Sequence, residues 1–141
     1  MVELFNPSNP PVGTNINTAA FPAILKRGAL WIPHLIRCRL VADVNAATRT
    51  VTFEIYSFDT QRTFVVQAPM NQTASQTVDY QIALGVNENT FAPLGTVPGL
   101  AIMPLPEMKL NGQVVLRTIT NNIQAGDQFG DIAIWAEQCG S

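Results

Sequence analysis

Few residues of this sequence could act as catalytic nucleophiles or bases. Nucleophilic catalysis by serine needs a nearby base, yet the sequence holds a single histidine, His34, and no serine in a G-x-S-x-G turn. A glycine-rich loop that opens a helix, as phosphate binding requires, is also missing from the pattern. The sequence therefore favours neither a serine hydrolase nor a nucleotide-binding enzyme.

Metal binding and acid–base catalysis have equally weak support. Zinc takes nitrogen and sulfur ligands at short, regular spacings, and one histidine with two cysteines in no CxxC pair does not supply such a set. Paired carboxylates can hydrolyse glycosides, but we expect each candidate to be a solvated strand or turn residue: Glu54, Asp79, Asp127 and Asp131. We therefore expect no enzyme, no cofactor and no metal site.

The single histidine and the two cysteines are expected to have structural roles. His34 falls on the inward side of a predicted strand beside Pro33, so we interpret it as a packed, hydrogen-bonded core residue. Cys38 lies in an apolar stretch and Cys139 lies two residues before the end of the sequence. Two cysteines so placed do not form a disulfide framework, and we expect both to be free thiols.

The composition indicates one domain with an unusually neutral surface. The 141 residues are 47% hydrophobic and 13% charged, whereas about 25% charged residues is usual. The net charge of −2 gives no basic excess for nucleic acid or anionic lipid, and the first residues lack the pattern of an export signal, so we expect no nucleic-acid or membrane partner. A surface with few ions to desolvate favours assembly with other proteins; a stable, neutral β-domain is the alternative.

The first 22 residues are expected to form an extended arm, followed by a β-domain over residues 23–141. Residues 6–13 contain three prolines and a glycine, which prevents a helix. Val2, Leu4 and Phe5 are apolar and need a surface that covers them. Either another protein or the chain's own domain can supply this surface.

Alternation of apolar and polar residues predicts strands along the rest of the chain. Pro33 lacks a backbone N–H and indicates either an edge position or a bulge that breaks the first long strand in two. The strands are expected near residues 30–42, 50–56, 63–66, 77–84, 100–103, 114–120 and 131–137.

The connections between these strands predict the fold class. The second and third strands are expected to pair as a hairpin, and the last two as a closing hairpin through the turn at residues 121–127. No stretch shows helical spacing. We predict an all-β fold of seven to nine strands with almost no helix, arranged as a single antiparallel, jelly-roll-like β-sandwich.

Two tryptophans and two arginines are candidate interface residues. Trp31 and Trp135 both fall on the side of their strands opposite the aliphatic residues, and Arg37 and Arg39 share the side of Trp31. Tryptophan and arginine are enriched at the centres of protein interfaces. The alternatives are that the tryptophans lie under the arm or a long loop and that the arginines form a solvated stripe.

The C-terminal part of the sequence resembles a pattern of small virion proteins of tailed bacteriophages. The resemblance spans Leu116–Phe129 and Asp131–Glu137, and most of it lies in the segment Ile123-Gln124-Ala125-Gly126-Asp127-Gln128. The strand from Trp31 to Leu40, with its alternating arginines, is also similar. Pro33 and the continuation past Glu137 depart from the pattern.

This resemblance implies a capsid cement or decoration protein on the exterior of the virion, made in the bacterial cytoplasm. Its partners would be the major capsid protein and further copies of the chain, with a trimer favoured over a dimer. Val2, Leu4, Phe5 and Pro7 would dock on the capsid. The subunit interface would consist of Trp31, Arg37, Arg39 and Trp135. The alternatives are a low-copy tail, head-fibre or connector protein and a carbohydrate-binding jelly-roll module.

Overall fold

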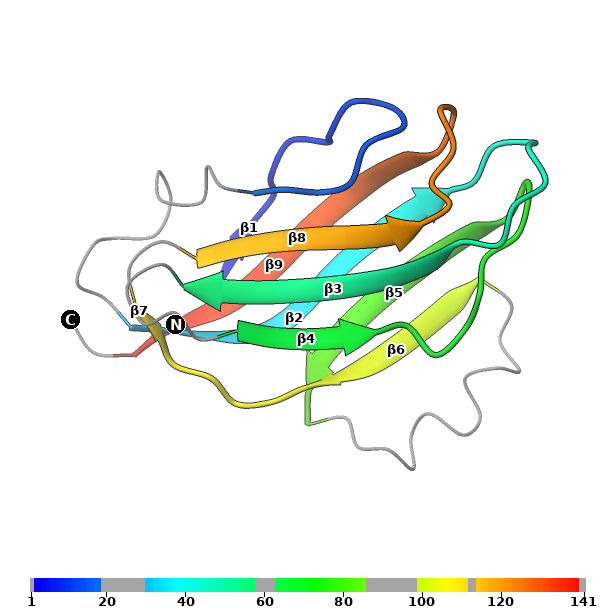
Figure 1. Ribbon diagram of the computed structural model, residues 1–141. Helices are drawn as coiled ribbons and strands as arrows, with labels where there is room; N and C mark the ends of the chain where they lie inside the picture. The colour runs from blue at the N-terminus through cyan, green and yellow to red at the C-terminus, as the bar shows by residue number, and fades with distance from the viewer. Residues whose placement is uncertain (1, 19–29, 58–62, 86–98, 112–113, 140–141) are drawn as a thin grey trace.

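The structure is a computed structural model that describes residues 2–18, 30–57, 63–85, 99–111 and 114–139. These residues form two facing β-sheets and include no helix (Figure 1). The larger sheet has the order β1-β9-β2-β5-β6, with β7 paired to β2, and the smaller sheet has the order β4-β3-β8. The predicted all-β sandwich is confirmed.

Seven of the nine strands in the described residues lie close to the predicted positions, whereas the short strands at residues 2–5 and 110–111 were not among those predicted. The larger sheet contains β1 (Val2–Phe5), β2 (Leu30–Val41), β5 (Thr77–Leu84), β6 (Leu100–Leu105), β7 (Leu110–Asn111) and β9 (Gln128–Cys139). The smaller sheet contains β3 (Thr50–Ser57), β4 (Thr63–Gln67) and β8 (Val114–Asn121). The pair β3–β4 is the predicted hairpin, whereas β5 and β6 run parallel, so the larger sheet is mixed and not wholly antiparallel as expected.

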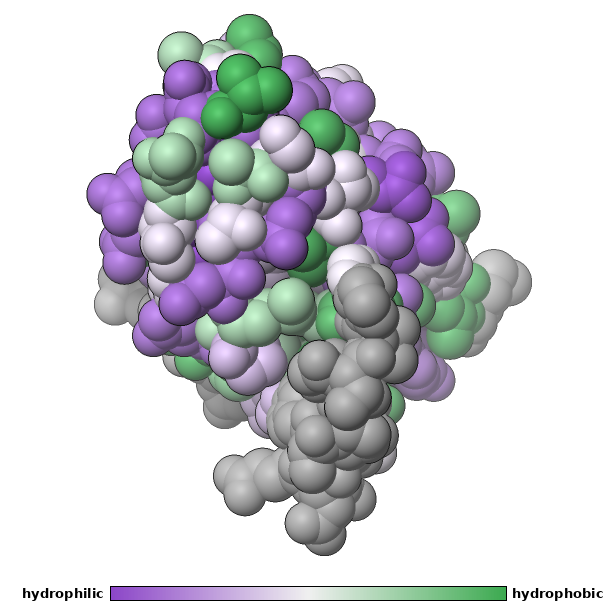
Figure 2. Space-filling view, turned by 90° about the vertical axis from the view of Figure 1, so that its right-hand side faces the viewer, coloured by the Kyte–Doolittle hydropathy of each residue, from purple (hydrophilic) through white to green (hydrophobic). Residues whose placement is uncertain are grey.

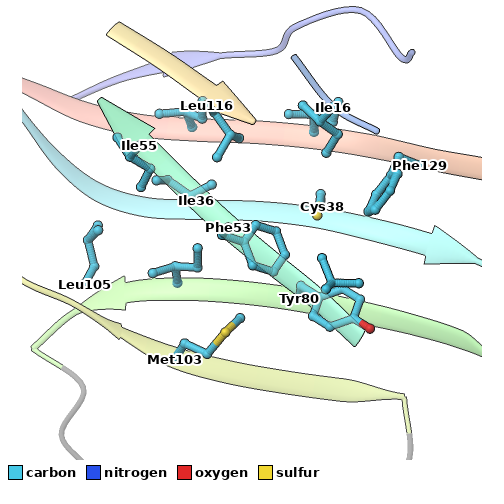
Figure 3. Packing of buried hydrophobic residues seen from close by; sticks show 14 of the residues in the cluster. Ile16, Ile36, Cys38, Phe53, Ile55, Tyr80, Met103, Leu105, Leu116 and Phe129 are labelled. Carbon is cyan, nitrogen blue, oxygen red and sulfur yellow. The ribbon is translucent and has the colours of Figure 1, made fainter. Parts of the chain in front are cut away.

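The core lies between the sheets and is crossed by a continuous row of apolar side chains. Phe5, Ile134, Ile36, Ile82 and Met103 are cross-strand neighbours along β1, β9, β2, β5 and β6, and all are buried. The smaller sheet contributes apolar residues that face this row, including Phe53, Ile55 and Leu116 (Figure 3). Each buried side chain of this size stabilises the fold by roughly 2 kcal/mol, so this row is a main source of stability.

A β-bulge changes which residues of β2 face the core. The pairing of β2 with β9 skips a residue between Pro33 and Leu35, as the proline predicted, but the strand continues through it. Because side chains alternate along a strand, one extra residue reverses the alternation. Trp31 therefore faces inward with 2% of its surface exposed, which corrects the prediction that it points outward.

The last two long strands do not form the predicted closing hairpin. β8 pairs with β3 in the smaller sheet, whereas β9 pairs with β1 and β2 in the larger sheet. The chain crosses between the sheets through residues 122–127, where Asp127 is fully buried. Its carboxylate accepts hydrogen bonds from the backbone N–H groups of Gln124 and Asp43, which fixes the crossing.

The N-terminal segment packs on the chain's own domain. β1 pairs with β9, and residues 15–18 lie beside β8, where Thr118 N–H donates to the carbonyl of Ile16 and Thr18 N–H donates to that of Leu116. The segment thus passes from the larger sheet to the smaller one (Figure 1). The chain's own domain covers Phe5, which is 5% exposed, whereas Val2 and Leu4 stay 47% and 49% exposed. Residues 19–22 of the expected arm lie outside the described parts.

Candidate interaction surface

The outward face of the larger sheet carries a second row of apolar side chains, which we call the outer row. Each of its members is one residue away from a member of the buried row, so it points to the opposite face of the sheet. The cross-strand neighbours along β1, β9, β2, β5 and β6 are Leu4, Trp135, Leu35, Ala83 and Pro104. Leu4 is 49% exposed and the other four are half-buried, so water reaches the whole row.

Arg37 lies over the indole ring of Trp135. The guanidinium carbon is 5.7 Å from the ring centroid, within the range of a cation–π contact. Arg37 is two residues beyond Leu35, the cross-strand partner of Trp135, so the two side chains meet diagonally across β2 and β9. This contact joins the outer row to a polar region of the same face.

Arg39 is held between two carboxylates in that polar region. Its Nε donates to Asp79 Oδ1 at 2.8 Å, its Nη2 donates to Asp79 Oδ2 at 3.3 Å, and its Nη1 lies 3.2 Å from Asp131 Oδ2. The hydrogen bond to Asp79 is the main cause that raises the pKa of Arg39 above its usual value. Two carboxylates thus share one arginine, and the three side chains together carry one net negative charge.

His34 lies on the outer side of the bulge and not in the core as predicted. Its Nε2 is 2.9 Å from Glu137 Oε2, and both side chains are more than one-third exposed, at 35% for His34 and 42% for Glu137. The predicted hydrogen bond is present, but the bulge turns the ring away from the core. The pair lies beside Val2, which is the cross-strand partner of Glu137.

The structure brings most of the predicted site residues onto this one face. Val2 and Leu4 of the expected capsid-docking group are exposed there beside Trp135, Arg37 and Arg39 of the expected subunit interface. Pro7 lines a shallow hollow next to them, together with Asn6, Asn9, Arg37, Asp131 and Ile132. Two groups that the sequence treated as separate surfaces are therefore continuous.

The structure corrects the predicted roles of Phe5 and Trp31 as contact residues. Phe5 is 5% exposed and meets the ring of Trp31 edge-on, with centroids 5.4 Å apart and an interplanar angle of 78°. Both rings therefore belong to the core, where they cannot reach a capsid or another subunit. Phe5 follows the exposed Leu4 directly, and alternation along β1 turns it to the inner face.

The candidate carboxylates are each bound to an arginine and not to one another. Glu54 pairs with Arg117 at 2.8 Å, Asp79 and Asp131 share Arg39, and Asp127 pairs with Arg49 at 2.9 Å. Asp127 is fully buried, which corrects the expectation that it is solvated. Asp79 and Asp131 therefore lie on either side of one arginine and line one small hollow with Arg37, Arg39 and Gln81, whereas Glu54 and Asp127 each pair with a different arginine.

The remaining candidate groups lie in structural environments. Cys38 is a free thiol in the core, where burial raises its pKa well above the usual value and suppresses the reactive thiolate. Within the described residues, no three histidine, cysteine, aspartate or glutamate side chains come together as metal ligands. The same residues include no long apolar helix of the kind that crosses a membrane.

Sequence reasoning missed three members of the outer row and the buried Arg49–Asp127 pair. Leu35 and Ala83 belong to strands whose alternation was visible, and Pro104 follows the predicted strand 100–103. Only the pairing register shows that the three form one row with Trp135. Arg49 precedes a predicted strand, and no local pattern distinguishes a buried arginine from a solvated one.

Comparisons with protein-family models, with curated proteins and with solved structures found no match for this chain.

Proposed function

We propose that this chain is a non-enzymatic capsid cement or decoration protein of a tailed bacteriophage, which binds across neighbouring major capsid subunits. The observation that carries the proposal is the outer row: apolar side chains cross five strands on an exposed sheet face and adjoin a tryptophan–arginine contact. Interfaces between proteins combine such apolar centres with tryptophan and arginine. The resemblance in the C-terminal sequence supplies the class of virus.

The charges around the outer row favour contact between two copies of the chain. The group formed by Arg39, Asp79 and Asp131 carries one net negative charge. Arg37, which lies over the ring of Trp135, places a positive charge beside this group. A face with adjacent positive and negative regions is complementary to itself when a second copy is turned by a two-fold rotation. This supports a contact between pairs of copies, as in the dimer that stood as the alternative to the trimer, and each copy would contribute capsid contacts.

The carbohydrate-binding alternative has less support from the same contact. A sugar platform needs the face of an aromatic ring to be open to the ligand. Trp135 is half-buried and Arg37 lies over its ring at 5.7 Å. A glycan array would revive this alternative if a sugar bound and Trp135→Ala abolished the binding.

The copy number in purified virions of the source phage tests the proposal. Quantitative mass spectrometry should give close to one copy of this chain per major capsid protein, since a cement protein covers the whole shell. A ratio of a few per cent would replace the cement role with a low-copy tail, head-fibre or connector role. Absence of the chain from virions would overturn the proposal.

A further inference from the structure

Four loops gather at one end of the sandwich and form a surface that we call the apex. They comprise residues 10–14, 43–49, 71–76 and 122–127 (Figure 1). Hydrogen bonds connect them directly: Gly13 N–H donates to the carbonyl of Asp127, and Ser75 N–H donates to the carbonyl of Asp43. Figure 2 views this end of the molecule and shows hydrophobic areas interspersed with hydrophilic ones.

Every ionisable side chain of the apex is turned inward. The four loops contain Asp43, Arg49 and Asp127, whose side chains are 14%, 0% and 0% exposed. Arg49 donates to Asp127 and to Asp43, so the three charges are used within the protein. The surface that the apex presents to solvent is therefore almost free of charge.

The exposed residues of the apex are small, apolar or neutral. Val44 is 83% exposed and Val12 is 57% exposed, and Ala46 and Ala125 are also exposed beside threonine, serine, asparagine and glutamine residues. A shallow hollow opens between two of the loops and is lined by Ala46, Ala47, Thr48, Thr73 and Ala74. Such a surface loses little hydration energy when another neutral protein surface covers it.

The buried charges also hold the apex in one conformation. Asp43 accepts hydrogen bonds from the backbone of Gly126 and from Asn45, and Asn122 donates to the carbonyl of Thr48. Asp127 connects the crossing segment to Asp43 and Arg49. Loops that are fixed before binding lose less conformational entropy in a complex, which favours a docking role.

We propose that the apex is a second docking surface, whose partner is an uncharged, predominantly apolar surface of the capsid protein. The inference rests on the proposed function and deepens it: the outer row joins copies of the chain, so binding to the capsid needs a further contact surface. The absence of exposed charge defines the partner, because a charged surface would be desolvated against the apex with no compensating ion pair. Binding through the apex is thus insensitive to salt.

The test measures binding of the full-length chain to shells of the source phage that lack it, at low and at high salt. We expect Val44→Asp to weaken binding at least about tenfold, because it places an uncompensated charge in the contact. Val44→Thr, which is close in shape and neutral, should bind within about threefold of the original chain. Val65→Asp is the matched control, since Val65 is 54% exposed on β4, outside the apex, and should leave binding unchanged.

The outcomes separate the inference from the proposed function. Equal binding by Val44→Asp and the original chain would overturn the apex as a docking surface while leaving the cement role intact. A steep fall of binding by the original chain at high salt would also overturn it, because charged groups would then carry the capsid contact. Failure of the original chain to bind shells at all would refute the proposed function, and the inference with it. Thermal unfolding of each variant verifies that these exposed substitutions leave the fold intact.

Discussion

Arg49 and Asp127 form a two-point ion pair that is fully enclosed where β3 begins and the chain crosses between the sheets. Arg49 Nε donates to Asp127 Oδ2 at 2.9 Å, and Arg49 Nη2 donates to Asp127 Oδ1 at 3.0 Å, with both side chains 0% exposed. Arg49 Nη1 donates to the carbonyl of Ala47 as well. Because their hydrogen-bonding groups are matched, the two charges can be buried in this position.

Asp127→Asn should destabilise the protein by roughly 3 kcal/mol, because it removes the fully buried carboxylate of the pair and leaves Asp43 as the remaining countercharge of Arg49. Urea unfolding at neutral pH measures the change in the free energy of unfolding. Glu54→Gln is the matched control, since its partner Arg117 is 42% exposed; it should cost about 1 kcal/mol or less. Equal losses in the two variants would contradict the structural role of the buried pair.

The same pair predicts a loss of stability in acid. Burial by itself raises the pKa of Asp127, but hydrogen bonds from Arg49 and from the backbone N–H groups of Asp43 and Gln124 outweigh it and hold the pKa below the ordinary 3.8. A carboxyl group with a lowered pKa stabilises the fold above its unfolded-state pKa, and this contribution is lost as the pH falls through the folded-state pKa. The free energy of unfolding should therefore drop below about pH 4, and less steeply in Asp127→Asn.

Adjacent residues of β1 should respond very differently to truncation. Phe5→Ala removes a ring that packs against Trp31 and should cost roughly 3 kcal/mol of stability. Leu4→Ala changes a side chain that is 49% exposed and should cost about 1 kcal/mol or less. Chemical unfolding of the two variants measures both losses of stability. Similar losses would mean that β1 is not docked on β9 as the structure places it.

Trp135→Ala should weaken self-association of the chain without a comparable loss of stability. If the outer row is the contact between copies, loss of the indole should raise the dissociation constant about tenfold or more. Sedimentation velocity over a concentration series measures this. Val65→Ala, on the smaller sheet, should leave the association unchanged. An unaltered mass distribution for Trp135→Ala would remove this face from the subunit interface.

Gly13 and Gly85 both have positive φ, at +78° and +85°, but their surroundings differ. A Cβ at Gly13 would lie 2.8 Å from the carbonyl oxygen of Ala125, whereas a Cβ at Gly85 would meet nothing within 4 Å. Gly85→Ala should cost about 1 kcal/mol from backbone strain, and Gly13→Ala should cost more, about 2–3 kcal/mol, because the clash adds to it. Thermal unfolding midpoints that shift equally would argue against the contact between residues 10–14 and the crossing segment.

Local patterns in the sequence were sufficient to predict the fold class and most of the strands. The alternation of Val78, Tyr80 and Ile82 with polar residues shows which side of β5 faces the core, because successive side chains of a strand point to opposite faces. Pro33, through its missing N–H group, predicted either an edge position or a bulge, and the structure has the bulge. The composition alone likewise predicted a surface with few charges.

Which residues meet across strands depended on the tertiary structure. The bulge reversed the alternation that had placed Trp31 outside, and the crossing at residues 122–127 placed β8 and β9 in different sheets. Register and sheet membership are set by contacts between residues far apart in the chain, and local spacing does not encode them. For the same reason the sequence showed Arg37 and Trp135 as candidates, but only the folded chain placed one over the other and buried Arg49 against Asp127.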